Sequence, residues 1–137
     1  MYSVVLQNFP ADGDGPANKY GIAWEGAQMV LEDLWQIPDV YHLKDKWAAI
    51  RDALTRSAAD EQDNKALYLA HISASVGVLP IEAAAGPKNR TVVGMNDETG
   101  RWLEAGDQNG RTGVVIFDFP GKKGIDAVLA RNAAFKA

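Results

Sequence analysis

The sequence contains no cysteine, which excludes disulfide bonds, cysteine-ligated zinc, iron–sulfur clusters and cysteine nucleophiles. No apolar run approaches the roughly 18 residues that a membrane-spanning helix needs. The first ten residues, MYSVVLQNFP, lack the charged start and cleavage site of a signal peptide, so we expect no secretion signal. Only two histidines occur, and this argues against a metal site built from several of them.

The sequence also has no excess of basic residues. Fourteen Lys and Arg against eighteen Asp and Glu give a net charge of −4, whereas a protein that coats nucleic acid needs a basic surface. The 137 residues, 47% hydrophobic and 23% charged, are enough for one domain with a real core. Small molecules and lipid headgroups remain as possible ligand classes.

Four short apolar runs are typical of β-strands, and they lie at residues 2–9, 34–41, 66–75 and 111–119. Pro38 weakens the second run because proline cannot donate to a strand ladder. Residues 10–27 hold many glycines and predict a long loop. Residues 76–110 predict irregular structure with a short helix near 81–85.

The clearest helix is predicted over residues 43–57. Its apolar stripe recurs every three or four residues, and its members are Leu43, Trp47, Ile50 and Leu54. The opposite, solvent-facing side is expected to carry Lys44, Lys46, Arg51, Asp52 and Arg56. A last helix is predicted over residues 125–135. Strands that alternate with helices predict an α/β fold with parallel strands.

Each predicted strand turns polar toward its end. Side chains two residues apart share a face of a strand, so Trp35, Ile37 and Asp39 are expected on one face. The polar residues near the strand ends are Gln7, Asn8, Asp39, Tyr41, His71, Ser73, Ser75 and Asp118. Since ligands bind at the carboxyl ends of parallel strands, this pattern favours a site there. The alternative is that each group simply meets solvent where its strand ends.

Short catalytic motifs are few. His71 and Ser73 would lie on one face of a strand. A small independent hydrolase that uses His71, Ser73 and Asp118 is therefore a further alternative, although no G-x-S-x-G turn is present. His71 is otherwise a core or pocket histidine. Residues 12–23 begin like a calcium loop but end in Ala23 instead of glutamate, so we expect no calcium site there.

Several segments in order resemble the bacterial phosphatidylinositol-specific phospholipases C. The segments are IPDVYHLKDKWAAIRDAL, ALYLAHISAS and GRTGVVIFDFPG followed by IDAVLARN, with YSVVLQNF and GIAW before them. The resemblance implies a TIM-type (β/α) barrel of which residues 1–137 cover only the second half, about strands five to eight. The chain is then a single partial domain, a truncated barrel whose strand near residue 2 is the fifth of eight.

The resemblance also implies site residues. Asp39 and Tyr41 match the D-x-Y pair that contacts the inositol ring. Ser73 lies near the serine that contacts the headgroup, and a shift of register admits Ser75 instead. His71, on the same strand, is expected at the substrate. Asp118 matches the aspartate that hydrogen-bonds the general-base histidine, and it is the one catalytic residue expected here. The two catalytic histidines and the arginine of that family belong to the first half, which nothing here matches.

The implied chemistry is that of a phosphoric diester hydrolase in lipid metabolism. A histidine takes the proton of the inositol 2-hydroxyl, which attacks phosphorus, and an acid protonates the departing diacylglycerol oxygen. We expect no cofactor; relatives sometimes use calcium. The partners implied are a phospholipid headgroup or inositol phosphate, a membrane surface contacted peripherally and an N-terminal barrel half, and no nucleic acid is expected.

A different class of function stays open. Four parallel strands without barrel closure expose two edges, which invite pairing with another chain. The alternative is therefore a non-catalytic interaction fragment that self-associates into a homo-oligomer. The cell compartment is not determined by the sequence, although the proteins that it resembles are typically secreted.

Overall fold

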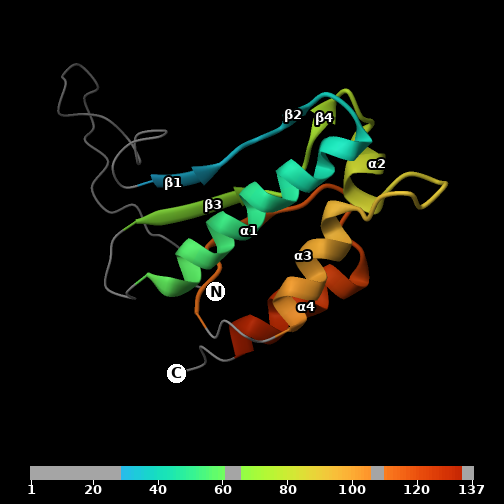
Figure 1. Ribbon diagram of the computed structural model, residues 1–137. Helices are drawn as coiled ribbons and strands as arrows, with labels where there is room; N and C mark the ends of the chain where they lie inside the picture. Colours follow the sequence, from blue (N-terminus) through green and yellow to red (C-terminus); the bar gives the residue numbers. More distant parts are fainter. Residues whose placement is uncertain (1–28, 61–65, 106–109, 134–137) are drawn as a thin grey trace, which may run out of the picture.

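We describe a computed structural model of the chain, for residues 29–60, 66–105 and 110–133 (Figure 1). Along these residues strands alternate with helices, as the sequence predicts. The elements in order are β1 (Met29–Glu32), β2 (Gln36–Ile37), η1 (Val40–His42), α1 (Leu43–Ala59), β3 (Leu67–His71), β4 (Ser75–Val76), α2 (Pro80–Ala85), α3 (Met95–Glu104), β5 (Val114–Ile116) and α4 (Lys122–Ala133).

The strand pairs within the described residues are all parallel. β1, β3 and β5 form a sheet in the order β1-β3-β5, and β2 pairs with β4 further along the same two segments. The α/β class with parallel strands is therefore confirmed. The described part of the chain holds three strands in its main sheet, so this sheet is not a closed barrel.

The pairing changes register between the two ladders. Glu32 pairs with Ala70 at the end of the first ladder, and Gln36 pairs with Ser75 in the second. Three residues, 33–35, therefore lie opposite four residues, 71–74. The Trp35 amide donates to the Asp33 carbonyl at 2.9 Å, which makes a tight turn centred on Leu34. Regular pairing is therefore interrupted at the carboxyl ends of β1 and β3, where residues 33–35 lie beside residues 71–74.

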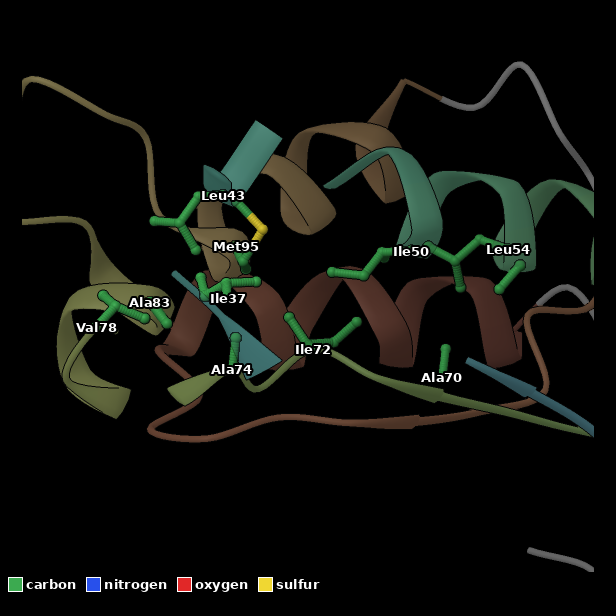
Figure 2. Packing of buried hydrophobic residues seen from close by; sticks show 11 residues of the cluster. Ile37, Leu43, Ile50, Leu54, Ala70, Ile72, Ala74, Val78, Ala83 and Met95 are labelled. Carbon is green, nitrogen blue, oxygen red and sulfur yellow. The ribbon is translucent and has the colours of Figure 1, made fainter. Parts of the chain in front are cut away.

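The core lies between α1 and the sheet (Figure 2). Leu43, Ile50 and Leu54 of the predicted stripe are fully buried on α1, and Trp47 packs against them. Small and branched side chains face them from the β3–β4 segment: Ala70, Ile72 and Ala74 alternate as a strand requires. The helix predicted over 43–57 is confirmed and extends to Ala59.

Lys46 differs from its prediction. We expected it on the solvent side of the helix, but it is fully buried, because its ammonium group donates to both carboxylate oxygens of Glu32 at 2.9 and 3.0 Å. Periodicity alone does not reveal a charged residue whose partner lies on a strand 14 positions earlier. Burial lowers the pKa of Lys46, and the Glu32 carboxylate opposes that shift.

The strand predicted over residues 34–41 is largely wrong. The sheet strand is β1, just before it, and residues 34–41 form the short β2 and the 3-10 turn η1. The turn at Leu34 interrupts the side-chain alternation, so Ile37 is buried in the core whereas Trp35 is exposed. Asp39 and Tyr41 are not on a strand at all, because Asp39 caps η1.

The helix α3 was missed within the region predicted to be irregular. Gly100 and many polar residues weaken its pattern, yet Met95, Thr99 and Leu103 recur at four-residue spacing and are buried. The short helix near 81–85 is confirmed as α2, and the last helix as α4, which begins earlier, at Lys122. Predicted strand 66–75 divides into β3 and β4, and 111–119 contracts to β5.

The predicted strand at residues 2–9 and the predicted loop at 10–27 lie outside the described residues. Within the described ranges, no helix is both long and apolar enough to span a membrane.

Candidate functional site

A cavity of about 390 Å³ opens where the parallel strands end. The side chains and backbone that line it belong to the ends of the three sheet strands and to the start of α2. They are Asp33, Trp35, Ser73, Ala74, Ser75, Pro80 and Asp118. This is the place in a parallel α/β sheet where ligands usually bind.

The sheet topology brings these polar groups together from distant parts of the sequence. Asp33 directly follows β1, Ser73 lies two residues after β3 and Asp118 lies two residues after β5. Because β1, β3 and β5 are adjacent and parallel, their carboxyl ends meet at one edge. Ser73 and Asp118, both predicted from the sequence as site residues, therefore line the same cavity.

His71 lies beside Asp33 and ties β3 to β1. Its Nδ1 is 3.2 Å from the Glu32 carbonyl oxygen and 3.5 Å from Asp33 Oδ1. Both are acceptors, so Nδ1 carries the proton in the neutral ring and Nε2 is left as an acceptor. His71 does not line the cavity, but it contacts Asp33, which does.

A buried ion pair lies under the same strand end. Besides the two bonds from Lys46, Glu32 Oε1 accepts the Leu34 amide at 3.0 Å. The carboxylate therefore joins α1 to the first residues of the tight turn that presents Asp33 and Trp35. A paired and hydrogen-bonded charge of this kind fixes geometry, since each partner left alone in the core would be costly.

A side chain of α3 also fixes the backbone at Asp118, which follows β5. Asn96 Nδ2, at the start of α3, donates to the carbonyl oxygens of Asp118 at 2.9 Å and Phe119 at 3.1 Å. Phe119 has a left-handed φ of 48°, an uncommon conformation for an aromatic residue. Asn96 thus holds the turn that follows Asp118, and sequence reasoning missed it because α3 was not predicted.

Asp39 caps η1 and Tyr41 lies within it, and neither residue lines the cavity. Asp39 Oδ1 accepts from the amides of Tyr41 at 2.8 Å and His42 at 3.2 Å, and it pairs with His42 Nδ1 at 2.8 Å. The hydrogen bond from His42 lowers the pKa of Asp39. The Tyr41 side chain is exposed.

The sequence contains the same spacing six residues earlier. Asp33-Leu34-Trp35 is also an Asp-x-aromatic triplet, and both Asp33 and Trp35 line the cavity. Sequence reasoning missed this pair because it began the strand at Leu34. The signal that could have found it is the apolar run MVLE directly before Asp33, since that run is the sheet strand.

The residues that line the cavity include two aspartates and two serines, and no Lys or Arg from the described residues. Such a surface accepts hydrogen bonds from hydroxyl or ammonium groups and lacks a cation to neutralise a phosphate. The described ranges also hold no group of three or more His, Asp or Glu side chains placed to bind a metal ion.

Comparison with solved structures finds a similar fold in one known protein. The chain superposes on the phosphatidylinositol-specific phospholipase C from Listeria monocytogenes with a TM-score of 0.66, at 23% identity, over 83% of this chain. It shares part of the fold of that phospholipase. The match spans 38% of the Listeria chain, well under two thirds of its length.

The resemblance to bacterial phosphatidylinositol-specific phospholipases C that the sequence shows is therefore confirmed at the level of the fold. Neither the protein-family models nor the curated proteins give a match.

Proposed function

We propose that this chain forms the second half of a phosphatidylinositol-cleaving barrel and binds the inositol ring of the lipid headgroup. The observation that carries the proposal is the cavity at the strand ends, where Asp33, Ser73 and Asp118 converge. The partial fold shared with the Listeria phospholipase supports the same conclusion. Catalysis then requires a first half of the barrel, which supplies the histidines and the cation.

The chemistry of the lining suits a polyol. Carboxylates and a serine hydroxyl accept hydrogen bonds from ring hydroxyls, and Ser73 also donates one. The Trp35 indole, 44% exposed at the cavity, offers a flat apolar surface to the face of a ring. We therefore assign the D-x-aromatic role to Asp33 and Trp35. The predicted roles of Asp39 and Tyr41 at the substrate stay predictions.

Asp118 is the proposed catalytic contribution of this chain. In the implied reaction a histidine from the first half removes the proton of the 2-hydroxyl, and the oxygen attacks phosphorus. The phosphorus–oxygen bond to diacylglycerol breaks, and an acid returns a proton to the departing oxygen. Asp118 would hydrogen-bond the base histidine and stabilise its protonated form, as the carboxylate of a Ser-His-Asp triad does.

His71 has a supporting role in this proposal. Its Nδ1 faces Asp33 Oδ1 and the Glu32 carbonyl, so the ring fixes the direction in which Asp33 presents its carboxylate. We assign it to positioning of the substrate-binding carboxylate. It does not replace either of the two histidines that the first half of the barrel would supply.

Titration of the ¹⁵N-labelled 137-residue chain with myo-inositol tests the binding site. We expect chemical-shift changes at Asp33, Trp35, Ser73 and Asp118. Asp33→Asn should weaken binding by about tenfold or more, because a hydrogen bond to a charged acceptor is worth about 1.5–3 kcal/mol. Asp39→Asn is the matched control and should leave the affinity unchanged. Absence of shifts at the cavity would refute the binding site.

A vesicle assay tests the need for a first half. The chain alone should release no inositol phosphate from phosphatidylinositol vesicles, with the Listeria phospholipase as the positive control. Cleavage by the chain alone would refute the half-barrel requirement, whatever the outcome of the binding experiment.

A further inference from the structure

A second cavity, of about 410 Å³, is lined by α3 and by the loop of residues 86–94 that joins α2 to α3. This loop projects from the helices (Figure 1). The two ends of the loop cross in backbone contact. A Cβ atom on Gly86 would lie 2.8 Å from the Val92 carbonyl oxygen, and one on Gly94 would lie 2.4 Å from that of Ala84. Because only glycine allows these approaches, the loop is closed at its base and forms one wall of the cavity.

Charged residues of both signs line this second cavity. Arg90 belongs to the loop, and Asp97 and Arg101 belong to α3, where their four-residue spacing places them on one face. The Arg90 amide donates to the Pro87 carbonyl oxygen at 2.9 Å, and Arg90 has a left-handed φ of 53°, so a turn sets its place in the loop. Among the described residues, two arginines and one aspartate line this cavity, whereas the cavity at the strand ends has two aspartates and no Lys or Arg.

Most donors of the two guanidinium groups have no partner among the described residues. No hydrogen bond or ion pair joins the side chain of Arg90 or of Asp97 to another described residue. Arg101 pairs with Glu98 at a distance of 3.9 Å, and its side chain is 57% exposed, so this surface pair holds it weakly. Since an arginine has five N–H donors, the cavity offers several of them to a ligand.

We propose that the cavity lined by Arg90 and Arg101 binds a phosphate ester that carries free hydroxyl groups. A guanidinium group presents its donors in a planar fork, which fits the oxygens of a phosphate. The Asp97 carboxylate repels the phosphate but accepts a hydrogen bond from a hydroxyl, so it favours a polyol ester over inorganic phosphate. Glycerol phosphate has both groups, as the free ester or as the headgroup of phosphatidylglycerol. This inference does not depend on inositol binding at the strand ends.

Titration of the ¹⁵N-labelled 137-residue chain with glycerol 1-phosphate tests the free ester. We expect chemical-shift changes at Val92, Val93 and Asp97, and glycerol alone should produce none there. Arg101→Gln should weaken binding by about tenfold or more, because it removes charged donors to the phosphate. Arg51→Gln is the matched control: Arg51 is an exposed arginine of α1 outside the cavity, so this variant should keep the native affinity. Asp97→Ala should abolish the preference for glycerol 1-phosphate over inorganic phosphate.

Cosedimentation with phosphatidylglycerol vesicles, compared with phosphatidylcholine vesicles, tests the lipid headgroup. Binding that depends on Arg101 in either experiment supports the proposal and identifies the ligand as the free ester, the lipid or both. Equal affinities of Arg101→Gln and Arg51→Gln would overturn it, since net charge alone would then govern binding. Absence of binding in both experiments would also overturn it, as would shifts confined to the cavity at the strand ends. Inositol binding at the strand ends can succeed or fail without changing these outcomes.

Discussion

Two Asp–His pairs in this molecule have similar chemistry and different roles. Asp39 and His42 are three residues apart, both are well exposed, and their pair closes a single turn. Asp33 follows β1 and His71 ends β3, and their pair lies beside the cavity, where it is less exposed. The first pair is visible in the sequence and serves local structure. The second depends on the parallel pairing of β1 with β3, and it supports the candidate site.

The largest expected effect on stability comes from breaking the buried Glu32–Lys46 ion pair, which lies under the turn that carries Asp33. Glu32→Ala leaves the Lys46 ammonium buried without its carboxylate, which should lower the free energy of unfolding by about 3–5 kcal/mol. Urea denaturation followed by circular dichroism measures the change. The double variant Glu32→Leu with Lys46→Met should recover most of the loss. A single-variant loss below about 1 kcal/mol would contradict the buried ion pair.

An intermediate effect is expected from the long-range pair itself. His71→Ala removes the hydrogen bond between Nδ1 and the Glu32 carbonyl, so we expect a loss of about 1 kcal/mol in unfolding free energy. Inositol binding should weaken at the same time, because Asp33 loses its neighbour. The matched variant His42→Ala in the local pair should leave inositol binding intact. Equal effects of both variants on binding would remove the distinction between the pairs.

The smallest effect is expected from the local pair, and it depends on pH. Hydrogen bonds from His42 and the η1 backbone lower the pKa of Asp39 below the ordinary value of 3.8. Its ionised form therefore stabilises the fold above pH 3.8, and this stabilisation is lost as the pH falls through the lower folded pKa. Thermal unfolding of the native chain and Asp39→Ala should differ slightly at pH 7 and converge in strong acid. A constant difference would argue against the cap.

The same contrast explains what could be predicted from the sequence. The α1 stripe and the parallel α/β class follow from local periodicity, and both are confirmed. Ser73 and Asp118 were predicted as site residues because they end apolar runs, and both line the cavity, while their roles stay predictions. Lys46 and Asn96 were not found, because their partners, Glu32 and the Asp118 carbonyl, are distant in the sequence. Asp33 and Trp35 were missed because Leu34 makes a turn, which no periodic pattern indicates.

The unequal segments between the two ladders have a consequence for the curvature of the sheet. Three residues on one segment span the same level as four on its neighbour, so the two paths differ in length and cannot both run straight. Local irregularities of this kind give a flat sheet the bend that a cylinder requires. Removing one residue from 71–74 would equalise the paths and straighten the sheet. The residues that shape the cavity are therefore also those that set the curvature of the wall around it.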